Sequence, residues 1–484
     1  MHIKATVPYR IRTVGLILLL VHSNWSFAQA APASPDRPWR SSDQQQLARD
    51  VQRFRDSRGS IDSSKVYTLL ELVDFAEAHH PSTRVAWENA SAEAAAFGIA
   101  RSELYPTLAV VALAQVSREA IGLGSEFVIQ TLPAFEGTLD LQYTVFDFGA
   151  RSGRIAAARA RSLAANLVFN DTHRKIINQV EQSYYRLLNT LGQEDAARAS
   201  LANARSVQEA AEERLNHGLA TLPDVLEARS ATAQTGYELQ SVLGAEEIAR
   251  GELASTLDVP PYTVIRVQPL DELRIPDSVG EDVEQAIQRA LEQRPDLLAE
   301  AAEIRQTAGR IKEARAAYYP SLTLNFNPGA QSLYVLQEGF DWGHTSGVFG
   351  GFSLSLNWTV FDGGARTSRL SQAVAAARAA EAGVGVIRDQ VADEVWTAYS
   401  NFKTALRQRQ AAVAFLAAAT KSYEAALESY QYGVRNFLDV SAAQKTLARA
   451  RSTDVLARTQ ILSTLADLAF RVADSIQPVP RRGP

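Results

Sequence analysis

The chain has 484 residues, of which 46% are hydrophobic and 21% are charged, with no cysteine and seven histidines. This composition excludes a disulfide framework, a thiolate metal site and a cysteine nucleophile, and it differs from that of a disordered chain. With 49 Lys and Arg against 54 Asp and Glu, the net charge of −5 argues against a nucleic-acid-binding protein.

The first 30 residues are organised like a secretory signal. A lead with three Lys and Arg residues precedes an apolar run at 14–21, and small residues follow up to Ala30. The run is much shorter than the about 20 residues that a membrane-spanning helix needs. We therefore predict a signal peptide at 1–30, cleaved after Ala30, the alternative being an uncleaved interfacial anchor. An irregular N-terminal extension containing several prolines is expected at 31–65.

Two motifs occur twice at a nearly constant distance along the chain. YPTL at 105–108 returns as YPSL at 319–322, and TVFDFGAR at 144–151 returns as TVFDGGAR at 359–366. Matches in one register over such a length indicate a tandem duplication. The predicted organisation is repeat 1 at 66–258, a connector at 259–281, repeat 2 at 282–474 and a C-terminal tail at 475–484.

Both repeats are dominated by strong helix formers. A proline is expected to separate two helices in each repeat, at 68–79 and 82–104 and again at 282–293 and 296–318. Runs rich in Ala, Arg, Glu and Gln follow at 151–216 and 366–431, and after a glycine turn come further helical runs at 222–257 and 437–474. A helix as long as 151–216 measures about 100 Å, which is too long for a compact globule. We predict coiled-coil hairpins at 150–257 and 364–474.

Alternating polar and apolar residues predict strands before each long helix. The pattern is clearest at 138–145 and 352–360. The predicted strands are 105–118, 134–146, 320–330 and 350–361, with loops at 118–133 and 331–349. Such segments are typical of a transmembrane β-barrel, but a half-buried soluble hairpin pair alternates in the same way. Four strands cannot close a barrel and lipid does not tolerate open edges, so membrane strands would require several chains to combine.

Glycines mark the turns of both predicted hairpins. Gly218 and Gly433 stand where the long helices would end, and Asp224 and Asp439 fall in the first turns of the helices that follow. The presence of both aspartates is explained equally well by a favourable helix start and by a functional role.

The strand–helix junctions share a second motif. Asp147 and Asp362 are predicted to cap the long helices, and Gly149 and Gly364 are predicted to permit a sharp change of direction there. No catalytic constellation, metal-ligand spacing or phosphate loop is recognised. The sequence therefore predicts no enzymatic activity, no cofactor and no metal.

The duplicated unit, the alternating strands, the very long helices and the tip motif GLATLPDVLEA at 218–228 together resemble the TolC-like outer membrane efflux family over 66–474. The resemblance implies an α+β membrane protein, a homotrimer in a Gram-negative outer membrane. Four transmembrane strands per protomer would form a twelve-stranded barrel continuous with a long periplasmic α-helical barrel. It also implies a passive exit duct for efflux or type I secretion. Its expected partners are a periplasmic adaptor (membrane fusion protein), an inner-membrane transporter and outer membrane lipid, but no nucleic acid.

The resemblance also implies roles for residues at the tips. Matching positions suggest a periplasmic gate in which Tyr430 and Arg435 face Asp224 of a neighbouring protomer. Asp439 would supply a ring of carboxylates. Ala442 stands where well-known members have a second aspartate, so one ring is predicted instead of two. The positions that match the adaptor-docking tips of the family are Gly218, Leu219, Gly433 and Val434.

One alternative function stays open at this point. A periplasmic coiled-coil adaptor or scaffold protein would use the signal peptide and the helices but would need no membrane strands. The transported substrate of an exit duct is also open, since a drug, a metal ion, a polypeptide or a polysaccharide could use the same duct.

Overall fold

The computed structural model describes residues 46–51, 59–276, 278, 280, 282–337 and 343–473. The predicted signal peptide at 1–30 and the predicted tail at 475–484 lie outside the described residues, as does most of the predicted extension at 31–65. The chain separates into two compact units, Met1–Arg58 and Gly59–Pro484. In the first unit the described residues, 46–51, are helical, and the second unit contains the fold presented below.

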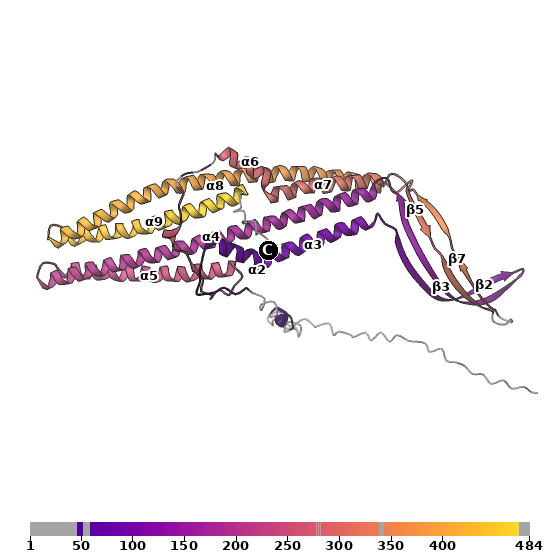
Figure 1. The fold of residues 1–484 in the computed structure, drawn as a ribbon, viewed down its shortest axis with the longest axis horizontal. Helices are drawn as coiled ribbons and strands as arrows, with labels where there is room; N and C mark the ends of the chain where they lie inside the picture. Colours follow the sequence, from indigo (N-terminus) through magenta and orange to yellow (C-terminus); the bar gives the residue numbers. More distant parts are fainter. Residues whose placement is uncertain are drawn as a thin grey trace, which may run out of the picture. The chain divides into compact units, whose positions relative to one another are not determined.

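The helices of the second unit follow the same order in both halves of the chain. Two shorter helices come first, then a helix of 67 residues, then a helix of about half that length (Figure 1). At 1.5 Å per residue the longest helices measure about 100 Å. The helices are α2 (Leu69–His79), α3 (Pro81–Ser102), α4 (Ala150–Asn216) and α5 (Leu222–Thr256), then α6 (Val283–Gln293), α7 (Pro295–Ala316), α8 (Ala365–Gln431) and α9 (Phe437–Val472).

Each long helix is accompanied along its length by two shorter ones. α3 packs beside α4 near the sheet and α5 packs beside it toward the tip, while α7 and α9 accompany α8 in the same way. The two halves join because α4 also packs against α7 and α9. Figure 1 shows the two helical hairpins, α4–α5 and α8–α9, ending side by side at the end away from the sheet.

Proline sets the break between the two shorter helices of each half. Pro81 is the first residue of α3 and Pro295 is the first residue of α7. The residues before them, His80 and Arg294, have extended backbones with ψ of 127° and 120°. The proline ring disfavours helical geometry in the residue that precedes it, so α2 and α6 end there.

Two glycines allow α4 and α7 to cross at very short distance. A Cβ atom on Gly153 would lie 2.7 Å from the carbonyl oxygen of Gly309 and 2.7 Å from the amide nitrogen of Glu313. A Cβ atom on Gly309 would lie 2.7 Å from the carbonyl oxygen of Gly153. Since backbone atoms cannot move aside as a flexible side chain can, this contact between the repeats requires glycine at both positions.

The strands form one antiparallel sheet that continues directly into the long helices. β2 pairs with β3, β3 pairs with β5 and β6, β5 pairs with β8, and β6 pairs with β7. β5 and β6 lie one after the other along the same edge of β3, and β7 and β8 lie in the same way along the next edge. The chain therefore crosses the sheet four times, and each crossing is called a strand path. Among the described residues, the outer edges of β2 and of the β7–β8 path have no strand partner. The strands are β2 (Thr107–Leu123), β3 (Glu126–Phe146), β5 (Ser321–Phe326), β6 (Gly329–Gln337), β7 (Gly343–Phe349) and β8 (Phe352–Asn357).

The predicted strand boundaries were wrong at the far end of the sheet. β2 and β3 continue through the predicted loop at 118–133 and leave only Gly124 and Ser125 between them. Gly124 has φ of +63°, which suits a two-residue hairpin turn. The polar residues Arg118 and Glu119 suggest a loop, but their backbones pair with Thr131 and Gln130 of β3. Parts of the predicted loop at 331–349 likewise belong to β6 and β7, and the predicted strand at 350–361 ends at Asn357.

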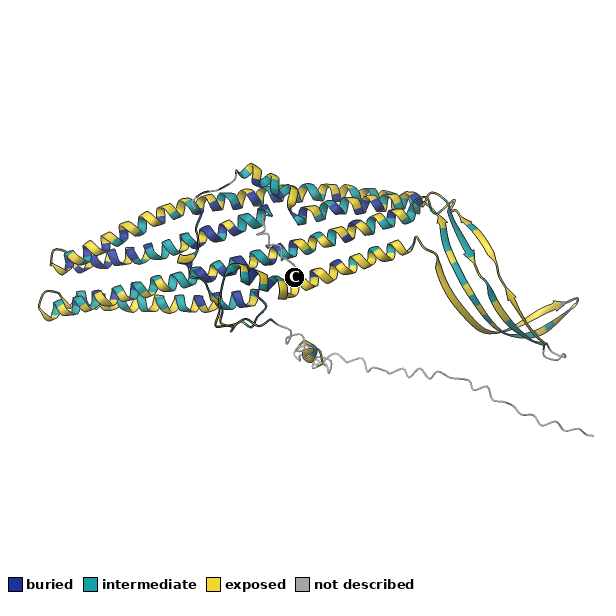
Figure 2. Cartoon of the chain, in the orientation of Figure 1, coloured by how far each residue is buried: buried dark blue, intermediate teal, exposed yellow. Residues whose placement is uncertain are grey.

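The largest apolar core lies where α2, α4 and α5 meet the segment that links the repeats. It includes Leu72 of α2, Tyr184 and Leu187 of α4, and Leu253 of α5, all with no exposed surface. Two short strands, β1 (Val66–Tyr67) and β4 (Arg266–Val267), pair in parallel beside this core, and the 3-10 turn η1 (Leu270–Glu272) adds Leu270 to it. Figure 2 shows buried positions along the facing sides of the helices, whereas the strands are mostly exposed or half-buried.

Candidate functional site

The turn between α4 and α5 is built by glycine and by a capping aspartate. Gly218 has φ of +71°, and the amide of Leu219 donates to the carbonyl oxygen of Arg214 at 2.8 Å, which closes the end of α4. Asp224 accepts hydrogen bonds from the backbone amide and the hydroxyl of Thr221, at 2.9 and 2.7 Å. The carboxylate of Asp224 is therefore engaged at the start of α5.

The turn between α8 and α9 has the same backbone but uses its aspartate differently. Gly433 has φ of +76°, and the amide of Val434 donates to the carbonyl oxygen of Ser429 at 2.9 Å. Here the side chain of Asn436 caps α9 by accepting from the amide of Asp439 at 3.0 Å. The Asp439 carboxylate is exposed, and within the described part of the chain it makes no hydrogen bond or ion pair. The two turns thus share one backbone conformation, but the Asp224 carboxylate is engaged in a helix cap and the Asp439 carboxylate is exposed.

Tyr430 lies inside the chain, between the two tips. Its side chain is 3% exposed, and its ring packs against Phe437 with ring centroids 6.2 Å apart. Burial raises the pKa of the Tyr430 hydroxyl; the Arg214 guanidinium lowers it and the Asp224 carboxylate of the same chain raises it. The described residues offer no hydrogen-bond partner to this hydroxyl.

The predicted gate residues are thus only partly brought together in one chain. Tyr430 and Asp224 are close enough to interact electrostatically, whereas Arg435 and Asp439 lie on the exposed surface of the α8–α9 tip. The predicted adaptor-docking positions are also exposed: Leu219 at 66% and Val434 at 80%, beside Gly218 and Gly433 in the two turns. The contact between Arg435 and a neighbouring protomer stays a prediction.

One residue at the tips was not predicted from the sequence. Arg214, in the last turn of α4, extends across to α8 and donates to the carbonyl oxygen of Tyr430 at 2.9 Å. A cation near a helix C-terminus is a local signal for carbonyl binding. This local signal does not indicate that the carbonyl oxygen bound by Arg214 belongs to another helix, α8.

The strand–helix junctions place the four predicted turn residues in two similar loops. Asp147 accepts from the amide of Arg151 at 2.8 Å and from the amide of Gly149 at 3.2 Å, and Asp362 accepts equivalent bonds in repeat 2. Gly149 and Gly364 have φ of +98° and +87° and occupy the N-cap positions of α4 and α8. The prediction that Asp147 and Asp362 occupy the cap positions was therefore wrong by two residues, although their carboxylates do bind the first turns of the helices.

The sheet separates apolar from polar side chains. On β2, Leu108 and Val110 are exposed, and on β8 Phe352, Leu354 and Leu356 are exposed. The opposite side is polar on β8, with Ser353 and Ser355, but on β2 it also carries Val111 and Leu113. Asn327 donates to Asp140 of β3 at 2.7 Å. An exposed apolar face of this size on a sheet indicates contact with an apolar medium or another apolar surface.

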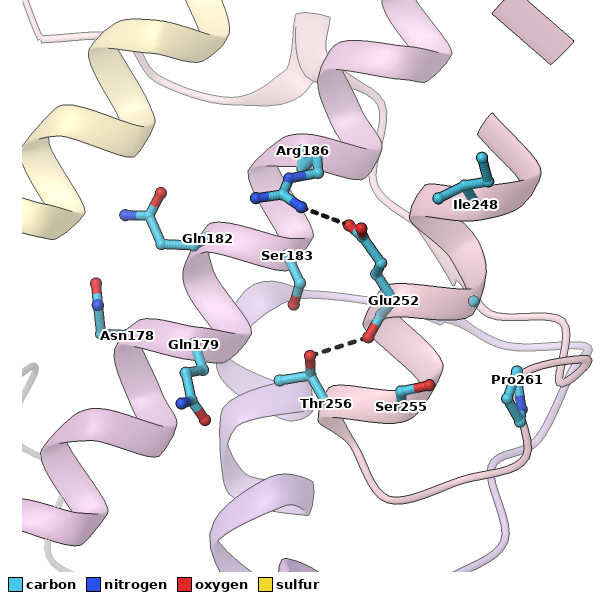
Figure 3. A pocket seen from close by; sticks show the side chains of 11 residues that line it. Asn178, Gln179, Gln182, Ser183, Arg186, Ile248, Glu252, Ser255, Thr256 and Pro261 are labelled. Atoms are coloured by element: carbon cyan, nitrogen blue, oxygen red, sulfur yellow. Dashed lines mark hydrogen bonds and ion pairs between the residues drawn. The ribbon is translucent and has the colours of Figure 1, made fainter. Parts of the chain in front are cut away.

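The helices themselves do not provide a membrane span or a reaction centre in the described residues. No described helix combines the length and apolar character needed to cross a bilayer, and no described cluster of His, Asp and Glu could hold a metal ion. A hollow of about 600 Å³ between α4 and α5 is lined mainly by amides, hydroxyls and the ion pair of Arg186 with Glu252 at 2.7 Å (Figure 3). Its lining residues contain no nucleophile paired with a base.

Buried charge is concentrated in the middle of the helical region. Arg294 is held by Asp296 at 2.6 Å and by Glu394 at 2.7 Å, and Arg471 also contacts Glu394 at 3.0 Å. Burial raises the pKa of Glu181 on α4 to about 7, and no hydrogen bond to this carboxyl is found among the described residues.

Comparison with known proteins identifies the family to which this chain belongs. The sequence model of a family described as outer membrane efflux protein matches residues 72–257 and 286–472, one segment in each repeat. The chain belongs to the outer membrane efflux protein family. As a TolC-like member of this family it is an efflux transport protein of the outer membrane, with a large periplasmic helical part. The predicted family and location are confirmed, and the location decides against a periplasmic adaptor.

Relatives of the family span most of the chain. Protein CyaE of Bordetella pertussis is 29% identical over 407 residues, covering 82% of this chain and 83% of that protein. Outer membrane protein OprJ of Pseudomonas aeruginosa is 24% identical over 385 residues, covering 78% of each. A crystal structure of a membrane protein from Pseudomonas aeruginosa has a TM-score of 0.74 at 23% identity, covering 86% of this chain and 95% of that one. The α+β fold, mostly helical with some sheet, is therefore that of the TolC-like channels.

Proposed function

We propose that this outer membrane efflux protein is the passive exit duct of a tripartite efflux or type I secretion system. In this proposal, cargo enters from the periplasm at the helix tips and leaves through the membrane-spanning sheet. A periplasmic adaptor and an inner-membrane transporter would complete the system and supply the energy.

The observation that carries this proposal is a sheet with an exposed apolar face that continues directly into helices about 100 Å long. In the described part of the chain, two edges of this sheet have no strand partner. In a bilayer core each backbone polar group needs a partner, so open edges must be paired by further strands. Three chains with four strand paths each would close a twelve-stranded barrel, and Leu108, Val110 and Leu354 would face lipid. The need for closure calls for several chains, and the resemblance to the TolC-like family implies that their number is three.

We further propose that the tips form the periplasmic gate. Asp439 and Arg435 are charged and exposed, and they have no side-chain partner among the described residues, so they are available to a neighbouring protomer. Three copies of Asp439 would form a single ring of carboxylates. In this proposal Arg435 faces Asp224 of a neighbouring protomer. Tyr430 is buried and acts within its own chain instead of facing that neighbour.

Adaptor docking is proposed at the apolar surface of the two turns. Leu219 and Val434 are exposed on turns whose backbones are held by Gly218 and Gly433. Exposed apolar groups on a preformed backbone favour binding because little ordering is lost on contact.

The test is single-channel recording of the detergent-purified protein in a planar lipid bilayer. We expect discrete, long-lived openings when the protein is added to one side only. Protein that stays soluble without detergent and gives no conductance would refute the duct and would place the apolar face of the sheet against another protein.

A further inference from the structure

A single arginine side chain joins the two helix tips of the chain. Arg214 Nη1 donates to the carbonyl oxygens of Tyr430 and Gln431, at 2.9 and 3.1 Å, and Nη2 lies 3.3 Å from the carbonyl oxygen of Leu219. The guanidinium carbon lies 4.6 Å from the centre of the Tyr430 ring. One planar cation thus contacts the end of α8, an aromatic face and the turn after α4.

The chemistry of this contact suits its partners. The last carbonyl groups of a helix lack intrahelical partners and carry the negative end of the helix dipole. A guanidinium has several donors in a fixed plane, so it can satisfy carbonyls of two segments together. Repeat 2 has Ser429 where repeat 1 has Arg214, and therefore the contact runs only from α4 to α8.

Near the tips the two hairpins also pack through buried apolar side chains, among them Val207 of α4, Tyr423 of α8 and Phe437 of α9. The other hydrogen bonds across the seam between the hairpins lie far from the tips. Gln182 exchanges two hydrogen bonds with Ser463, and Gln193 donates to the carbonyl oxygen of Ser452 at 2.9 Å. In the described part of the chain no hydrogen bond joins the hairpins between Gln193 and Arg214. A cavity of about 450 Å³ opens there between α4, α5 and α9, with Ser200 and Gln444 in its lining.

We propose that Arg214 is a positioning residue of the gate, which clamps the α8–α9 tip to the α4–α5 tip of the same chain. This inference rests on the proposed periplasmic gate. The clamp holds the turn that carries Arg435 and Asp439, and the cavity above it leaves α9 free to bend when the clamp is released. Opening then begins with loss of the Arg214 contacts to Tyr430 and Gln431, after which apolar packing alone holds the two tips together.

The test compares Arg214→Ala with Arg229→Ala. Arg229 lies on α5 and its guanidinium binds Glu212 at 2.8 Å, so this control removes the same charge without touching the other hairpin. In planar bilayers we expect the open-to-closed ratio to rise about tenfold in Arg214→Ala, equivalent to about 1.4 kcal/mol, and to stay unchanged in Arg229→Ala. Arg214→Lys keeps the charge with fewer fixed donors and should give an intermediate ratio.

A distance measurement tests the clamp independently of conductance. The chain has no cysteine, so spin labels can be placed at the exposed positions Leu219→Cys and Tyr432→Cys, with unlabelled chain in excess. The distance distribution should lengthen or broaden in Arg214→Ala and match the parent in Arg229→Ala. An unchanged distribution in Arg214→Ala would overturn the clamp while leaving the duct intact. A parent protein without conductance would overturn the proposed function, and the spin-label distances would still decide the clamp.

Discussion

The crossing of α4 and α7 makes a quantitative prediction about Gly153. In an exposed helix, replacing glycine by alanine stabilises the fold by about 1 kcal/mol, because glycine loses more backbone entropy on folding. At Gly153 the new Cβ atom would meet two backbone atoms of α7 at 2.7 Å, and both are held in a helix. Overpacking of this kind costs about 1–3 kcal/mol, so we expect Gly153→Ala to destabilise the protein on balance.

A matched glycine separates the two effects. Gly98 lies in α3, and a Cβ atom there would meet nothing within 4 Å. Gly98→Ala should therefore raise the midpoint of thermal unfolding in detergent, followed by circular dichroism, while Gly153→Ala lowers it. If both variants gain stability equally, the short distance between α4 and α7 does not exist in the folded protein, and the explanation of the contact is wrong.

Three further outcomes follow from the buried carboxyl and from the tips. Since burial raises the pKa of Glu181 from 4.5 to about 7, the folded state is penalised as pH rises between these values. Glu181→Gln should then stabilise by about 3 kcal/mol at pH 8 and by little at pH 4 in denaturant titrations, and a pH-independent gain would contradict this reasoning. Arg435→Ser should raise single-channel conductance, since it removes a proposed gate charge; unchanged conductance would exclude Arg435 from the gate. Val434→Asp should abolish export while trimers and conductance persist, and normal export in cells would exclude this turn from adaptor docking.

The sequence by itself determined the features that depend on local chemistry. The duplication, the order of helices and strands and the alternation of the strands can all be recognised along the chain. The tip turns at Gly218 and Gly433 and the junction turns at Asp147 and Asp362 follow from residues within a few positions of one another. Positive φ, helix capping and hydrophobic period are short-range properties, so a linear pattern is enough to predict them.

Only the tertiary structure decided what happens between the repeats. The short two-residue turn of β2 and β3 depends on pairing across strands, and the contact of Gly153 with Gly309 joins residues from different repeats. The burial of Tyr430 and the hydrogen bond from Arg214 to the carbonyl oxygen of Tyr430 likewise arise where α4 meets α8 and α9. These contacts are set by how the helices approach in space, and neither spacing nor propensity within one segment carries that information.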